Sequence, residues 1–191
     1  MCYERALPSP MNLREELLRE HSARHTQRLA DYACAHPTAL AQLLQLFWYG
    51  QHRERQLAAD VLGWVGERRP RWLVPHLPGL LAAAQPGPDE HPAVRRAVAR
   101  VLQFVPVPEE WQALAFDTCL RLLQNRHEPV AIRAYALTAA ARLAGYYPEL
   151  VNEVIYSVRK ALATSHSAAL HTRAGREIPK LLNLVRKHSA D

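Results

Sequence analysis

A group of basic residues near the C-terminus has the spacing of one face of a helix. The group consists of Arg173, Arg176, Lys180 and Lys187, which lie three, four and seven residues apart. At 100° per residue these side chains gather on one side of a helix. Such a face attracts phosphate groups or an acidic protein surface, so it is a candidate anion-binding or partner-binding site. A solvated face of an amphipathic capping helix has the same pattern, and this alternative stays open.

The residue types suited to catalysis or metal binding do not form a known motif. His21 and His25 are spaced i, i+4 and could face one metal ion from a helix, but no third ligand is evident. Cys119 has no paired histidine in the sequence and is predicted to be a small buried side chain. The glycine-rich phosphate loops, the nucleophile elbow and the zinc-protease motif are all absent. We therefore expect no catalytic site, no metal and no cofactor.

Composition and charge place the chain among globular proteins with one basic end. Hydrophobic residues make up 49% of the 191 positions and the formal net charge is +6. Residues 159–191 contain seven Arg and Lys against two Asp and Glu, so most of the positive charge lies there. Three widely spaced cysteines, with no signal peptide and no long apolar run, predict a cytoplasmic protein without membrane segments. Residues 1–10 are expected to form a flexible leader.

Prolines divide the sequence into segments of about one helix each. Ala, Leu, Arg and Gln dominate these segments and β-branched alternation is missing, so the fold is predicted to be all-α. Pro179 is expected to kink or split the last helix. The helices are predicted at residues 11–20, 22–35, 38–49, 52–68, 71–84, 92–105, 108–125, 129–146, 149–164 and 167–188.

Three of the predicted helices share one pattern. The apolar stripe of one helix recurs in the next at a shift of 38 residues, and in the preceding one at a shift of 40. The stripes are Val94, Val98, Val101, Leu102 and Val105, then Ile132, Ala136, Ala139, Ala140 and Leu143. An arginine stands at the second position each time, at Arg55, Arg95 and Arg133. We predict that these arginines are structural and bind a neighbouring carboxylate or carbonyl, forming a ladder. Glu54, Glu90 and Glu128 are the nearby carboxylate candidates.

The recurring pattern apolar-Arg-x-x-small resembles the second helix of the HEAT/armadillo-type repeat family. The segment LVPHLPGLL at residues 73–81 is similar to a first helix of that family with its proline. The resemblance implies a short right-handed α-solenoid, a superhelix of helix pairs. We expect N-terminal capping helices at residues 11–37 and one continuous domain of about four repeats. The repeats are predicted at residues 38–69, 71–105, 108–147 and 149–188.

The same resemblance implies a non-catalytic scaffold, expected to be a monomer, that binds another macromolecule, most often a protein. Nucleic-acid binding through a basic concave or C-terminal face stays as an alternative. Residues 47–62 loosely resemble a repeat of the HEAT-like alkylpurine DNA glycosylases, which would require an aspartate close to concave aromatic rings. Trp111 and Asp117 are six residues apart and are expected to face different ways. A continuous positive groove would favour nucleic acid, and a mixed or apolar groove would favour a protein partner.

Overall fold

The computed structural model describes residues 11–86 and 91–188, and within them the regular structure is helical. The predicted leader at residues 1–10 lies outside the described residues. The α-helices are α1 (Leu13–Arg19), α2 (Ala23–Ala35), α3 (Pro37–Tyr49), α4 (His52–Arg68), α5 (Leu77–Ala83), α6 (Pro92–Val101), α7 (Glu109–Gln124), α8 (Val130–Ala144), α9 (Val151–Ala163) and α10 (Ala168–His188). Two 3-10 helices, η1 (Pro70–His76) and η2 (Pro148–Leu150), precede α5 and α9. The prediction of an all-α fold is confirmed.

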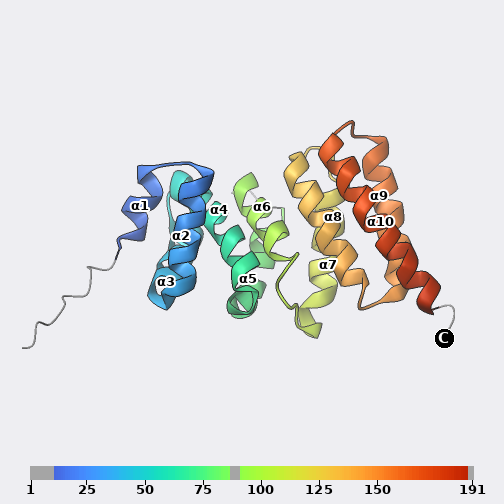
Figure 1. The fold of residues 1–191 in the computed structure, drawn as a ribbon, viewed down its shortest axis with the longest axis horizontal. Coiled ribbons are helices and arrows are strands. Elements are labelled where there is room, and N and C mark those ends of the chain that lie inside the picture. Colours follow the sequence, from blue (N-terminus) through green and yellow to red (C-terminus); the bar gives the residue numbers. More distant parts are fainter. Residues whose placement is uncertain (1–10, 87–90, 189–191) are drawn as a thin grey trace, which may run out of the picture.

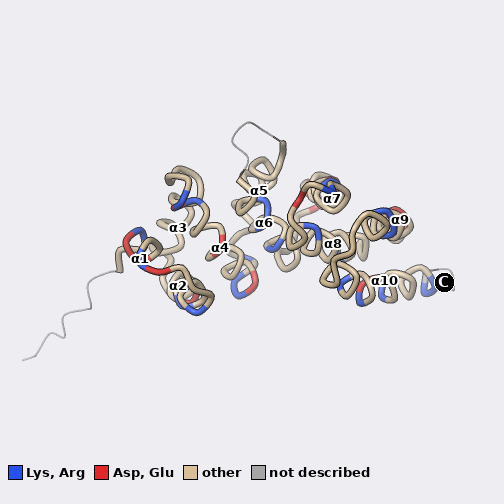
Figure 2. Tube along the Cα trace, turned by 90° about the horizontal axis from the view of Figure 1, so that it is seen from above, with Lys and Arg blue, Asp and Glu red and all other residues tan. Residues whose placement is uncertain are grey.

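The helices form two rows in which consecutive members pair as hairpins (Figure 1). Helices α2, α4, α6, α8 and α10 pack side by side and make the inner row, and α1, α3, α5, α7 and α9 make the outer row. Seen from above, the outer row is bowed and the inner row lies on its hollow side (Figure 2). This stacking of helix pairs is an α-solenoid, as the repeat pattern predicted. Its right-handedness stays a prediction.

The apolar stripes that recur in the sequence lie between the rows. Val98, Val101, Ala136 and Ala139 are each fully buried. Small residues let neighbouring inner helices come close, and Gly66 is the clearest case. A Cβ atom at Gly66 would lie 2.7 Å from Cγ2 of Val101, so α4 touches α6 at a point where only glycine fits.

Two proline-containing segments test the helix predictions, and one of them differs. Residues 71–84 were expected to form one helix, but this segment is η1 followed by the short helix α5. Pro75 and Pro78 lack the backbone donors that a continuous α-helix would use, which explains the tighter first part. The last helix is not split at Pro179, because α10 is one element, and the expected kink at this proline stays a prediction. Buried Ala174 and Leu181 pack on both sides of the proline, and this packing holds both halves in place.

The predicted division into caps and repeats is compatible with the helix bounds but remains a prediction. Each predicted repeat contains one outer and one inner helix. The predicted capping segment, residues 11–37, contains α1 and α2, which continue the same two rows. Across the described ranges, none of the helices has the length and apolar character needed to cross a bilayer.

Candidate functional site

The inner row carries a group of half-buried aromatic and charged side chains, here called the inner-face cluster. It consists of Asp60, Trp64, Arg96, Arg100 and Tyr135. Asp60 and Trp64 are one helical turn apart on α4, and Arg96 and Arg100 are one turn apart on α6. Residues at this spacing share a helix face, and α4 and α6 are neighbours, so the two pairs meet. Tyr135 joins them from α8.

Each arginine of the inner-face cluster is held by a carboxylate. Arg96 forms an ion pair with Asp60 across the α4–α6 contact. The Nη2 atom of Arg100 lies 2.6 Å from Oε2 of Glu67, and its guanidinium lies 3.7 Å from the centroid of the Trp64 ring. This distance is within the range of a cation–π contact. Because these contacts come from two adjacent helices, the cluster is fixed by the packing of the inner row.

A second arginine, one helical turn after Trp64 on α4, contacts the same tryptophan on the side that faces α2. The Nε atom of Arg68 lies 2.8 Å from Oδ1 of Asp31 on α2, and its guanidinium lies 5.1 Å from the centroid of the Trp64 ring. On the same side, Nε2 of His21 lies 3.6 Å from Oδ2 of Asp60. Positive and negative groups therefore alternate across α2, α4 and α6. The inner face here is a mixed surface with aromatic rings, not a continuous positive groove.

The four basic residues predicted to share one face of α10 differ in their exposure and in their contacts. Arg173 is half-buried and donates hydrogen bonds to Oγ1 of Thr138 at 3.0 Å and to Oε1 of Gln103 at 3.4 Å. It therefore turns inward toward neutral partners on the inner row.

The remaining three basic residues of the group are exposed. Lys180 is paired at 3.0 Å with Glu177, a buried carboxylate that the charge pattern did not single out. Arg176 and Lys187 point away from the core as unburied cations. Figure 2 shows this mixture of blue and red along α10. Whether this face binds an anion or a partner stays a proposal.

The three repeat arginines occupy different environments. The Nε atom of Arg95 lies 2.6 Å from Oε1 of Glu128, with both side chains buried. Arg133 is buried, and burial lowers the pKa of its guanidinium. It donates hydrogen bonds to the carbonyls of Leu123 at 3.1 Å and Ala161 at 3.0 Å.

Arg55, the first of the three repeat arginines, differs from Arg95 and Arg133 in the contacts of its Nε atom. Within the described residues, Nε of Arg55 is buried without a hydrogen-bond partner. The neighbouring Glu54 instead pairs with Arg14 of α1 at 2.5 Å, and the Gln51 backbone amide and Arg14 lower its pKa. Glu90 lies outside the described residues. The structural role of Arg55, Arg95 and Arg133 remains a proposal.

The histidine and cysteine candidates lie in separate surroundings. His25 is buried with Nε2 2.7 Å from the carbonyl oxygen of Glu16, whereas His21 faces Asp60. Among the residues that the structure describes, no three His, Cys, Asp or Glu side chains group into a potential metal site. Cys119 is fully buried, and burial raises the pKa of its thiol to about 12.

An aromatic and an acidic side chain do lie together on the concave side, but they are not Trp111 and Asp117. Asp117 is exposed on outer helix α7, whereas Asp60 and Trp64 are together on the inner row. Their i, i+4 spacing within a repeated helix was the signal that could have found them. The Asp60 carboxylate is occupied by Arg96, so it is a partner in an ion pair.

The two rows of paired helices and the inner-face cluster define a helical-repeat solenoid, a class that generally acts through its extended surfaces. The family model of the HEAT repeat domain matches residues 13–180. The chain therefore belongs to the HEAT repeat family, and the match includes both helices predicted as N-terminal caps. Proteins of this family are generally non-catalytic interaction scaffolds. No curated protein and no solved structure gave a significant match.

Proposed function

We propose that this HEAT-repeat chain is a non-catalytic module that binds another protein through the inner-face cluster. The observation that carries the proposal is the mixed character of this surface, where Arg96 and Arg100 are paired with Asp60 and Glu67 around the Trp64 ring. Tryptophan, tyrosine and arginine are the residue types enriched among binding hot spots of protein interfaces. Their fixed positions reduce the ordering cost of association.

The same contacts argue against the phosphate backbone of a nucleic acid as the main ligand of this face. A phosphate contact adds affinity when it releases counterions from the nucleic acid, which requires an available cation. Arg68, Arg96 and Arg100 each have a carboxylate within ion-pairing distance. A phosphate would have to displace these carboxylates and would then lie next to them.

The proposal is tested by affinity capture from the cells that make the protein, comparing matched surface variants. Trp64→Ala with Arg100→Ala removes the centre of the inner-face cluster. Tyr49→Ala with Arg53→Ala removes an aromatic and an arginine from exposed positions outside the cluster. We expect the wild type and the control variant to capture one protein in stoichiometric amounts. The inner-face variant should not capture this protein. The captured protein must then bind purified wild type in isothermal titration calorimetry. Equal capture by all three would overturn the proposal.

A further inference from the structure

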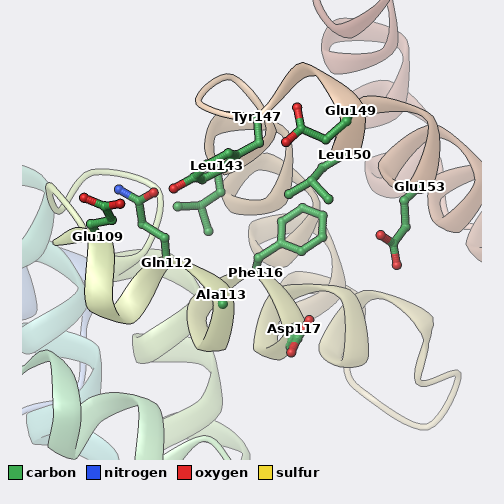
Figure 3. Close-up of a pocket in the computed structure, with 10 residues that line it drawn as sticks. All are labelled: Glu109, Gln112, Ala113, Phe116, Asp117, Leu143, Tyr147, Glu149, Leu150 and Glu153. Carbon is green, nitrogen blue, oxygen red and sulfur yellow. The ribbon is translucent and has the colours of Figure 1, made fainter.

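A cleft on the outer side of the solenoid has an apolar floor and an acidic rim. It lies between α7 and the start of α9, has a volume of about 450 Å³ and is here called the outer cleft. Phe116, Leu143 and Leu150 supply its apolar surface (Figure 3). The rim carries the carboxylates of Glu109, Asp117, Glu149 and Glu153.

The charge of the outer cleft is opposite to that of the whole chain. Its lining contains four carboxylates and no Lys, Arg or His, although the formal net charge of the protein is +6. For the described part of the chain, the four carboxylates take no part in the ion pairs that occupy the inner face. All four are exposed at the rim. A ligand that fills the cleft therefore needs an apolar centre and positive groups around it.

The carboxylates flank the floor from α7 on one side and from η2 and α9 on the other. Glu109 and Asp117 are eight residues apart on α7, which at 1.5 Å per residue is about 12 Å, or roughly two helical turns. Glu149 and Glu153 lie on η2 and α9, across the floor. Figure 3 shows Phe116 and Leu150 in the middle of this arrangement, with the acidic groups around them.

Exposed apolar side chains beside the outer cleft favour a macromolecule over a small cation. Tyr146 is 52% exposed next to the lining residue Tyr147, and Leu114 is 39% exposed next to Ala113. Tyr156 is 65% exposed and lies three residues after Glu153 on α9, on a similar face of the helix. Exposed large apolar side chains close to a cleft favour a protein-binding surface.

We propose that the outer cleft binds a basic amphipathic helix of a partner protein. In such a helix, a narrow stripe of apolar residues at i, i+4 has its sequence neighbours at about 100° to either side. When those neighbours are Lys or Arg, cations lie on both sides of the stripe, which matches an apolar floor with carboxylates on both sides. Most of the lining of this cleft comes from α7, η2 and α9, and it shares no residue with the inner-face cluster, so either proposal can fail without the other.

The probe is a fluorescein-labelled synthetic peptide of about 15 residues, with leucines at i, i+4 and i+8 flanked by arginines and alanine elsewhere. Binding is followed by fluorescence anisotropy at ~50 mM and ~150 mM salt. We expect saturable binding to the wild type. A peptide with alanine in place of leucine should bind about tenfold more weakly, because the apolar floor then loses its contacts. Equal affinity for both peptides, or no saturable binding of the leucine peptide, would overturn the proposal.

Matched lysine substitutions locate the binding. Ala113 is exposed in the lining of the outer cleft, and Ala163 is exposed at the end of α9 outside the lining. Both substitutions add one positive charge at exposed helical positions, where lysine is a good helix former. We expect Ala113→Lys to weaken peptide binding at least about tenfold, through repulsion and steric filling, and Ala163→Lys to change it less than about twofold. Similar losses in both variants would show unspecific charge attraction and overturn the proposal.

Neutralising the rim tests the carboxylates without altering shape. Asp117→Asn with Glu153→Gln removes two rim charges, and Glu15→Gln with Glu110→Gln removes two exposed charges outside the lining. Only the first pair should weaken peptide binding, by about tenfold, with a shallower salt dependence. Spermidine serves as competitor. If spermidine alone displaces the peptide at equimolar concentration, the cleft is a small-cation site and the proposed helix is wrong.

Discussion

Arg95 of α6 reaches the loop before α8, where its Nε atom lies 2.6 Å from Oε1 of Glu128 and both side chains are buried. The contact joins two successive helix pairs of the solenoid. The free energy gained by such a pair is partly cancelled by the cost of removing two charges from water. Removal of one partner, however, leaves the other charge buried without this contact, and the resulting loss of stability makes the pair testable.

Glu128→Gln is expected to destabilise the protein by about 3 kcal/mol, because the buried Arg95 guanidinium loses its contact with the charged Glu128 carboxylate. The double variant Arg95→Met with Glu128→Gln should recover at least half of that loss. Free energies of unfolding from urea denaturation of the wild type, both single variants and the double variant give the coupling energy. Strictly additive effects would show that the pair does not couple the two repeats.

Gly66→Ala is expected to destabilise the protein by about 1–3 kcal/mol, because its Cβ would lie 2.7 Å from Val101. Gly175 on α10 is the matched control, since a Cβ there meets no atom within 4 Å. Gly175→Ala should therefore stabilise the protein by roughly 0.4–1 kcal/mol, as expected for a helical glycine in open space. Thermal melts should show a lower melting temperature for Gly66→Ala and a higher one for Gly175→Ala. An unchanged melting temperature of Gly66→Ala would contradict the close approach of α4 and α6.

Val101→Asp and Ala139→Asp should each unfold the protein or lower its stability by several kcal/mol, because both positions are fully buried between helices. Circular dichroism at 222 nm, where α-helices give a strong negative band, follows the loss of structure on heating. The exposed Ala131 on α8 provides a control, and Ala131→Asp should melt close to the wild type. A Val101→Asp variant that melted within a degree or two of the wild type would show that the repeat register is wrong.

The sequence was sufficient for most of the helices and for their pairing, because the apolar stripes and prolines are local signals. Val101 and Ala139 were placed in the core by spacing alone, and both are fully buried. The binding surfaces were not predictable in the same way. The turn of Arg173 toward Thr138 and the pairing of Lys180 with Glu177 depend on where neighbouring helices lie. Helix periodicity places a side chain on a face but does not identify what lies opposite.

Cys119 is expected to resist alkylation in the folded protein, because burial raises the pKa of its thiol to about 12 and the reactive thiolate is absent near neutral pH. The raised pKa also means that the folded state retains a proton which the unfolded chain loses above its ordinary pKa. Stability from this group is therefore present at neutral pH and decreases as the pH rises from about 9 toward 12. Mass spectrometry of peptides after iodoacetamide treatment at pH 8 measures the reaction. Rapid labelling of Cys119 without denaturant would contradict its burial.

Duplex DNA is expected to bind weakly, with a shallow dependence on salt. Three or four phosphate contacts from the C-terminal basic group would give a slope of log affinity against log salt near −3, at about −0.9 per contact. Arg173 is turned toward Thr138, and Lys180 is paired with Glu177. Among the described residues, Arg176 and Lys187 are therefore the exposed cations of the group that form no ion pair with a carboxylate. Two contacts predict a slope of about −2.

Fluorescence anisotropy of a labelled duplex from ~50 mM to ~200 mM salt measures this slope. Arg173→Glu with Arg176→Glu reverses two charges of the group, and Arg24→Glu with Arg53→Glu reverses two exposed charges near the N-terminus. If Arg176 makes most of the phosphate contacts, the variant with Arg173→Glu and Arg176→Glu should lose most of the DNA affinity of the wild type. The variant with Arg24→Glu and Arg53→Glu should keep that affinity. A wild-type slope of −3 or steeper that the first variant flattens would instead show that Arg173 and Lys180 leave their protein partners to bind phosphate. That result would favour nucleic acid as the ligand of α10.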